Sequence, residues 1–127
     1  MAIASIGKEH FLTEIISGAK QVVADEPEEL GGTNKGPAPG EFLLISLASC
    51  TAITIRMYAD RKKWPVEKIT VEVDFEKVAN KTIFKREVQL EGDLTEDQRT
   101  RLLQIANACP VHKTLTSPIE IETVLRD

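Results

Sequence analysis

The stretch that decides the fold is Gly40–Ile55, which reads GEFLLISLASCTAITI. Its apolar residues occupy every side at helical spacing, and a helix that is hydrophobic all round is normally buried in a core. The pattern then turns polar and meets Pro65. We therefore expect a helix from about Glu41 to about Lys63, roughly 33 Å long at 1.5 Å per residue. One thiol, that of Cys50, lies in its middle.

The same stretch raises the question of a membrane span. Only about 14 apolar-rich residues precede Arg56, fewer than the roughly 20 that a bilayer core requires. Ser46, Ser49 and Thr51 interrupt the run. We therefore expect a buried core helix and no membrane partner.

Length and composition favour one globular domain over residues 1–127, with 42% hydrophobic residues to build its core. The net charge of -4 and the sequence pI near 5.3 argue against a protein that binds a phosphate backbone. Only 5% of residues are aromatic, too few to favour a platform for stacking bases. We expect no nucleic-acid partner.

The two cysteines do not resemble the disulfide framework of a small secreted protein. Residues Met1–Lys8 lack the basic start and sustained apolar run of a signal peptide. We therefore expect a cytoplasmic protein, and paired thiols in that compartment are more often chemical than structural.

The segments that flank the long helix predict strands and a loop. Ser17 and Gly18 separate two β-prone runs, so two or three antiparallel strands are expected before Asp25. Residues Asp25–Gly40 hold four of the seven glycines and three of the six prolines, which predicts a long loop. This loop is either a surface connector or part of a site, and the sequence leaves both open.

Beyond the long helix, apolar and polar residues alternate over Thr70–Phe75 and Phe84–Leu90, which predicts an antiparallel hairpin. Arg86 falls on the apolar face of the second strand. It lies either at the sheet edge, which we favour, or beside a buried carboxylate.

The rest of the chain predicts two helices and a last strand. Thr95 and Gln98 form a capping-box pattern that begins a helix. Pro110 favours a short helix that Cys109 caps. Alternation over Ile119–Leu125 predicts the final strand.

The chemistry of the chain centres on Cys50 and Cys109. A thiol at a helix N-terminus has its thiolate favoured by unpaired backbone N–H groups, so spacing alone points to Cys109 as the reactive one. His112 follows three residues later, within reach on one helical face. The plain alternative is that both cysteines are small core hydrophobes.

A zinc site is the other chemistry to weigh, because Cys109 and His112 have ligand-like spacing. A closed structural site needs four ligands, and only Cys50 and His10 remain as soft or nitrogen donors. We expect no metal.

Three motifs together resemble the OsmC/Ohr family of osmotically induced and organic-hydroperoxide-resistance proteins. They are Gly36–Glu41 (GPAPGE), Leu47–Ala52 (LASCTA) and Cys109–Leu115 (CPVHKTL). The branch that carries a Cys-Pro-Val-His second motif is the most similar. The resemblance implies an α+β fold with antiparallel sheets wrapped around a long buried central helix, in an intertwined homodimer.

The resemblance also implies an activity, because characterised members are thiol peroxidases that act on organic hydroperoxides without a cofactor. Cys50 would be the peroxidatic thiolate, and it would become a sulfenic acid. Cys109 would resolve it as a disulfide that an external dithiol reduces. On the order of attack we follow the resemblance, which reverses the expectation from spacing.

Two departures from the family pattern leave a second hypothesis open. The family's peroxidases hold the attacking thiolate with an N-terminal arginine and a glutamate early in the long helix. Here no arginine precedes Arg56, and Gly40 occupies the position of that glutamate, with Glu41 next to it. Glu41 and His112 are the candidate supporting residues. The alternative function is a non-catalytic binding protein for a small apolar or acyl ligand.

Overall fold

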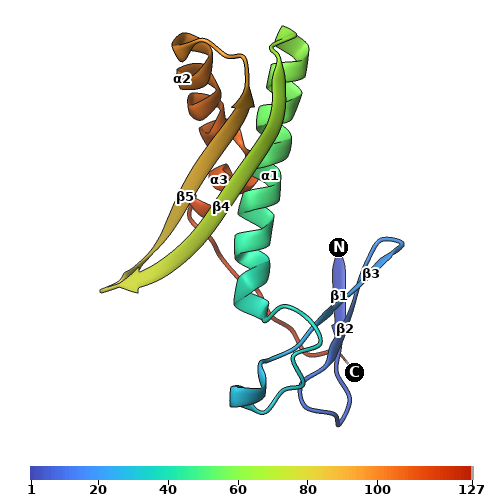
Figure 1. Cartoon of the computed structure of the whole chain (residues 1–127). Helices are drawn as coiled ribbons and strands as arrows, with labels where there is room; N and C mark the ends of the chain where they lie inside the picture. Colours follow the sequence, from blue (N-terminus) through green and yellow to red (C-terminus); the bar gives the residue numbers. More distant parts are fainter. Residues whose placement is uncertain (127) are drawn as a thin grey trace. The chain divides into compact units, whose positions relative to one another are not determined.

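The computed structural model describes residues 1–126, and it divides the chain into two compact units, Met1–Leu44 and Ile45–Asp127. Both units mix secondary-structure types around antiparallel sheets, and a long helix passes from the first unit into the second (Figure 1). The α+β class is therefore confirmed. A single domain over residues 1–127 stays a prediction.

The first unit contains a three-stranded antiparallel sheet in the order β1-β2-β3. The strands are β1 (Ala2–Ser5), β2 (Thr13–Ser17) and β3 (Lys20–Ala24). Gly18 forms the turn between β2 and β3 with a φ of 63°, a left-handed conformation that glycine adopts without steric cost. The predicted N-terminal hairpin is confirmed.

Asp25 organises the loop that follows β3. Its side chain is 1% exposed, and both carboxylate oxygens accept hydrogen bonds from neighbouring segments. The donors are the backbone N–H groups of Phe11, Glu26, Thr33 and Lys35 and the hydroxyl of Thr33. Several residues of the predicted loop are thus hydrogen-bonded to one carboxylate. The loop also contains a short 3-10 helix, η1 (Glu28–Leu30).

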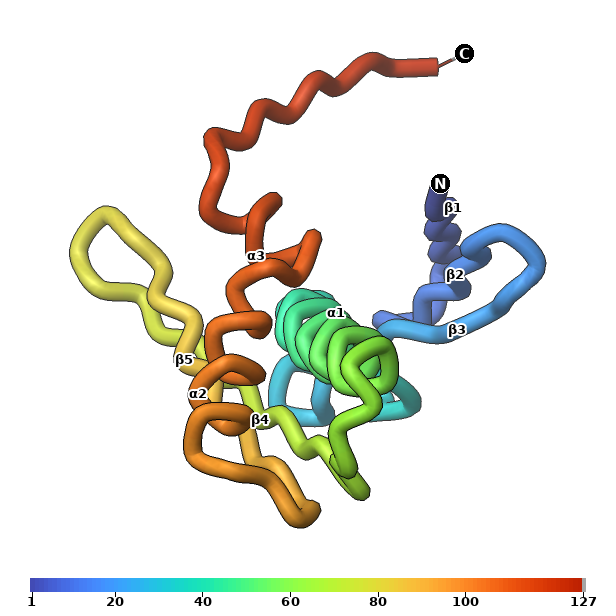
Figure 2. Tube along the Cα trace, turned by 90° about the horizontal axis from the view of Figure 1, so that it is seen from above, coloured from blue at the N-terminus to red at the C-terminus, as the bar shows by residue number. Residues whose placement is uncertain are grey.

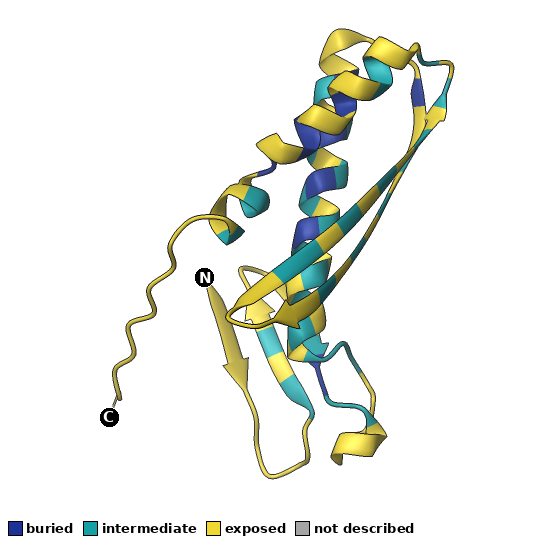
Figure 3. Ribbon diagram, turned by 90° about the vertical axis from the view of Figure 1, so that its left-hand side faces the viewer, coloured by how far each residue is buried: buried dark blue, intermediate teal, exposed yellow. Residues whose placement is uncertain are grey.

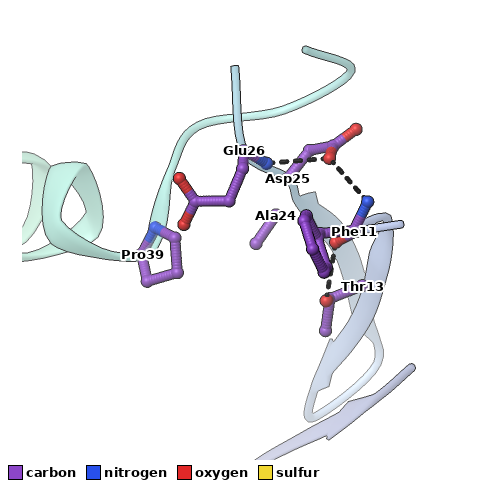
Figure 4. A pocket seen from close by; sticks show the side chains of 6 residues that line it. All are labelled: Phe11, Thr13, Ala24, Asp25, Glu26 and Pro39. Atoms are coloured by element: carbon purple, nitrogen blue, oxygen red, sulfur yellow. Dashed lines mark hydrogen bonds between the residues drawn. The ribbon is translucent and has the colours of Figure 1, made fainter. Parts of the chain in front are cut away.

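A largely apolar pocket of about 350 Å³ lies next to Asp25 in the same unit. Figure 4 shows the ring of Phe11 and the side chain of Pro39 among its walls. The other lining residues are Thr13, Ala24, Asp25 and Glu26. Part of the loop therefore lines a pocket.

Helix α1 (Pro39–Lys62) agrees with the predicted helix to within two residues at each end. Its buried residues recur every fourth position and so form one stripe: Leu47, Thr51, Ile55 and Ala59. Apolar side chains on other sides are open, and Ile53 and Met57 are 53% and 67% exposed (Figure 3). Within one chain, burial of the helix is limited to one face.

Helix α1 is also long and apolar enough to cross a bilayer by length and mean hydropathy alone. One such helix is weak evidence for a membrane protein, because the core helix of a soluble protein passes the same test.

The second unit is built on a long hairpin of β4 (Val66–Val78) and β5 (Lys81–Gly92). The strands pair antiparallel, with Val71 opposite Val88 and a register shift between Val66 and Lys68, so the predicted hairpin is confirmed. Ala79 forms the tight turn with a φ of 54°.

Helix α2 (Glu96–Ile105) begins at the predicted capping box, in which Thr95 and Gln98 each satisfy the other's backbone N–H. It packs against α1 and the hairpin through one cluster of buried residues: Ile55, Ala59, Val66, Leu102, Ile105 and Ala106. Trp64 covers this core and meets the ring of Tyr58 edge-on, with centroids 5.6 Å apart.

After α2, a 3-10 turn η2 (Ala106–Ala108) leads to Cys109, which is the N-cap residue of α3 (Pro110–Leu115). The predicted short helix is therefore confirmed. The predicted final strand is wrong for this chain, because residues 118 to 126 form neither helix nor strand (Figure 2). The alternating pattern is present, but a strand requires a hydrogen-bonded neighbour, and this segment pairs with none of the described residues.

Candidate dithiol site

The second unit brings Cys50 and Cys109 close enough for each thiol to shift the pKa of the other. Cys50 projects from α1 and is half-buried, whereas Cys109 precedes α3 and has no exposed surface. Both thiols are free. Two residues far apart in the sequence thus form one dithiol, which no spacing rule predicts.

Cys109 lies in an environment that favours its thiolate. Burial opposes ionisation, but the polar groups around the sulfur outweigh it, namely the thiol of Cys50, the hydroxyl of Thr51 and the backbone N–H groups of Val111 and His112. They hold the pKa of Cys109 below the ordinary value for a thiol.

Cys50 has the opposite character. Burial raises the pKa of its thiol, and so does the hydrogen bond to Cys109, which only the protonated form can donate. Hydrogen bonds from the backbone of Val111 and from Thr54 offset part of this. Of the two thiols, Cys109 therefore loses its proton the more readily, in agreement with the expectation from helix capping.

Thr51 connects the dithiol to the sheet. It is wholly buried one residue after Cys50, and its hydroxyl lies 2.6 Å from the carbonyl of Leu47 and 3.1 Å from Nη1 of Arg86. A hydroxyl has one proton and two lone pairs. Because the guanidinium can only donate, it takes a lone pair, and the proton is left for the Leu47 carbonyl or the Cys109 sulfur.

Arg86 reaches the dithiol from β5. Its Nη2 donates to Oδ1 of Asn107 at 3.0 Å and to Nδ1 of His112 at 3.3 Å, while Nη1 donates to Thr51. Neither the favoured position at the sheet edge alone nor a buried carboxylate describes this geometry. Arg86 does lie on an edge strand, because β5 pairs only with β4 among the described strands, but its half-buried side chain is directed at residues that flank the two cysteines.

His112 is neutral in this arrangement. Burial lowers the pKa of its imidazole, and the charge of Arg86 lowers it further. Since a guanidinium cannot accept a hydrogen bond, Nδ1 of His112 is the acceptor and the ring proton lies on Nε2. The side chain therefore faces Arg86, and His112 acts on Cys109 through its backbone N–H.

Comparison with known proteins gives the chain a family. Residues 32–124 match the family model described as OsmC-like protein. The chain belongs to the OsmC-like family. This match covers both cysteine motifs and most of the chain. No curated protein sequence matches it.

Solved structures of OsmC-like proteins share the fold. An OsmC-like protein from Mycoplasma pneumoniae is 21% identical, with a TM-score of 0.77 over 91% of this chain and 85% of that one. An organic hydroperoxide resistance protein from Legionella pneumophila is 25% identical, with a TM-score of 0.60 over 91% and 88%. An organic hydroperoxide resistance protein from Elizabethkingia anophelis is 21% identical, with a TM-score of 0.62 over 94% and 89%.

Glu41 is the remaining candidate residue of this OsmC-like chain. Glu41 is exposed in the first turn of α1 and belongs to the first compact unit. Among the described residues, no group of three or more metal-ligating side chains gathers.

Sequence reasoning missed Thr51, Arg86 and Asn107 as parts of the OsmC-like site. Thr51 looked like a polar interruption of an apolar helix. The one usable signal was Arg86, a charged residue on the apolar face of a strand, where an unpaired charge is costly.

Proposed function

We propose that this OsmC-like protein is a thiol-dependent peroxidase that reduces organic hydroperoxides in defence against oxidative stress. The observation that carries the proposal is the pairing of Cys50 with Cys109 in the second unit, where each thiol shifts the pKa of the other. Two neighbouring thiols can be oxidised to a disulfide with little movement of the backbone. Family membership and the names of the two hydroperoxide-resistance neighbours point the same way.

In the first step, Cys50 attacks the peroxide. Cys50 is the only one of the two thiols with exposed surface, so a hydroperoxide meets its sulfur first. Its proton passes to the Cys109 thiolate along the hydrogen bond that joins them. The Cys50 thiolate then takes the terminal peroxide oxygen, the O–O bond breaks, and the alkoxide leaves as an alcohol with a proton from water.

In the second step, Cys109 closes the disulfide. Its sulfur attacks the sulfenic acid of Cys50, the S–S bond forms, and the oxygen leaves as water with the proton that Cys109 had received. An external dithiol then reduces the disulfide. The reductant attacks at half-exposed Cys50, and buried Cys109 leaves as the thiolate that its hydrogen bonds stabilise.

We also propose that the protein works as a homodimer. The apolar side chains of Ile45, Ile53 and Met57 on α1 are between 46% and 67% exposed, which is unusual for the central helix of a finished fold. A second copy would cover them. The cytoplasmic location stays a prediction.

The proposal is tested by treating the reduced protein with one equivalent of an organic hydroperoxide and measuring its mass. We expect the loss of two hydrogens and a peptide in which Cys50 and Cys109 are linked. With Cys109→Ser, we expect a sulfenic acid on Cys50 that dimedone traps. With Cys50→Ser, we expect no trapped adduct and no turnover with a dithiol reductant.

Two results would contradict this scheme. An adduct on Cys109 in Cys50→Ser would reverse the roles of the thiols. Unreacted wild-type protein, together with an acyl ligand that raises the melting temperature equally in wild type and in the variant without cysteines, would favour the binding function.

A further inference from the structure

Arg86 joins the two segments that carry the cysteines of the dithiol. Thr51, which Nη1 binds, follows Cys50 directly on α1. Asn107 and His112, which Nη2 binds, lie two residues before and three residues after Cys109. One planar guanidinium thus spans the two segments that carry the sulfurs.

The partners of Arg86 exclude an ordinary ion pair as the reason for its position. Both salt bridges found among the described residues, Arg56–Asp60 and Lys85–Glu76, leave Arg86 out. Its three partners are a hydroxyl, an amide and a neutral imidazole. Removing part of a cation from water costs free energy, and no carboxylate among the described residues binds Arg86 to offset that cost. We therefore expect the role of Arg86 to lie in the positions of the three groups that it binds.

Each contact of Arg86 constrains one side of the dithiol. On α1, Nη1 donates to the buried Thr51 hydroxyl and so directs the hydroxyl proton away from the guanidinium, toward the Leu47 carbonyl or the Cys109 sulfur. At α3, Nη2 fixes the ring of His112, whose backbone N–H donates to Cys109. Lysine could not do both, because it lacks the planar fork.

We propose that Arg86 is a positioning residue of the dithiol, whose guanidinium holds α1 and the start of α3 in the arrangement in which Cys50 and Cys109 close to a disulfide. A disulfide requires an S–S distance of about 2.05 Å and Cα atoms about 4.4–6.8 Å apart, so a loss of alignment by an ångström lowers its yield. The inference rests on the proposed function for its biological meaning, but disulfide closure itself needs no peroxide.

The test uses the full chain in buffers of reduced and oxidised dithiothreitol, with the fraction of linked Cys50 and Cys109 measured by mass spectrometry after acid quenching. The closing reaction is exchange: oxidised dithiothreitol accepts two electrons and two protons, and the two thiols become one disulfide. The variants are Arg86→Met, Arg86→Lys and, as matched control, Arg101→Met. Arg101 is an exposed arginine of the same unit that binds Tyr58.

For Arg86→Met we expect an equilibrium constant for closure at least tenfold below wild type, which corresponds to about 30 mV. Arg86→Lys should lower this equilibrium constant less, because an ammonium can bind one partner at a time. Arg101→Met should have the equilibrium constant of the wild type. In a Cys50→Ser background, thiolate absorbance at 240 nm should show Cys109 titrating at higher pH in Arg86→Met and unchanged in Arg101→Met. A purely structural role would not produce this shift.

Closure of Arg86→Met to the wild-type extent would overturn the inference. Should Arg86→Met fail to fold, the same comparison with Arg86→Lys decides: closure equal to that of Arg101→Met overturns it. Failure of the proposed function is separable, since a wild type that closes its disulfide in dithiothreitol but leaves hydroperoxide unreduced contradicts the peroxidase and leaves the role of Arg86 intact.

Discussion

At the scale of single residues, the two thiols differ because their hydrogen bonds differ in direction. The neighbouring Cys109 raises the pKa of Cys50, whereas four polar groups lower the pKa of Cys109. Burial raises the pKa of both thiols and therefore does not distinguish them. The inner sulfur ionises the more readily and the outer one is the more accessible, which suits a pair that must be oxidised at one atom and resolved at the other.

Thr51→Val tests the hydroxyl that serves Cys109. Valine keeps the branched shape but cannot donate, so the pKa of Cys109 should rise and the thiolate fraction at neutral pH should fall. Thiolate absorbance at 240 nm in a Cys50→Ser background measures this. Thr54→Val is the matched control, because the hydroxyl of Thr54 serves Cys50 and not Cys109. Equal titrations of Cys109 in all three proteins would remove Thr51 from the site.

Asp25 gives a prediction about acid stability. The hydroxyl of Thr33, more than any other donor, lowers the pKa of the Asp25 carboxyl far below its ordinary 3.8, and backbone N–H groups add to this. Between 3.8 and the lower pKa of the folded state, the unfolded chain binds the proton and the folded chain does not. The stability that Asp25 contributes is therefore present above about pH 4 and is lost as the pH falls below it. Asp25→Asn should lower the urea midpoint at pH 6 and flatten its decline toward pH 3. A decline as steep as in wild type would mean that other carboxylates cause the loss of stability in acid.

At the scale of elements, local patterns explain most of what was predicted correctly. Helix α1 follows from its apolar run, the β4–β5 hairpin from alternation, and the start of α2 from a capping box. Each signal lies within a few residues of the element that it forms. The cap at Cys109 belongs to the same class, because Pro110 follows it directly.

Thr95→Ala tests the capping box as an element-level signal. It removes the acceptor of the Gln98 N–H and should cost about 1 kcal/mol, because α2 places Leu102 and Ile105 in the core. Urea titration followed by circular dichroism measures the loss. Thr95→Ser keeps the hydroxyl and should stay within about 0.5 kcal/mol of wild type; a loss as large as that of alanine would place the effect outside the cap.

The site was harder to predict than the fold because its contacts are long-range. Arg86 meets residues 35, 21 and 26 positions away, and no local pattern encodes such distances. The motifs identified the two cysteines, but only the fold shows that they touch. The prediction of a last strand was wrong for the reverse reason. The alternation of apolar and polar residues is present locally, but a strand requires a hydrogen-bonded partner, and residues 118 to 126 pair with none of the described residues.

At the scale of the whole molecule, a single chain leaves much apolar surface open. Ile53 and Met57 on α1 and Ile121 and Leu125 near the C-terminus are all more than half exposed. Exposed apolar surface of this extent commonly marks an interaction site. The proposed homodimer would account for this surface of the second unit without invoking another partner.

Ile53→Lys tests the dimer. A lysine placed in an apolar interface would have to be desolvated without a partner, so the variant should be monomeric or dissociate at far higher dilution than wild type. Light scattering coupled to gel filtration gives the mass. Glu67→Lys, at an exposed position on β4, is the control and should keep the wild-type mass. A wild type of 14.1 kDa at all concentrations would end the dimer proposal.

Trp64 gives the protein an internal optical reporter. It is the single tryptophan of the chain, and it lies against the core of the second unit, edge-on to Tyr58. Its emission therefore follows the unfolding of residues 45 onward, whereas far-ultraviolet circular dichroism also follows the strands β1 to β3. Coincident unfolding curves from the two signals would mean that both compact units unfold in one cooperative transition. Separated curves would mean that the second unit, which carries the dithiol, unfolds independently of the first.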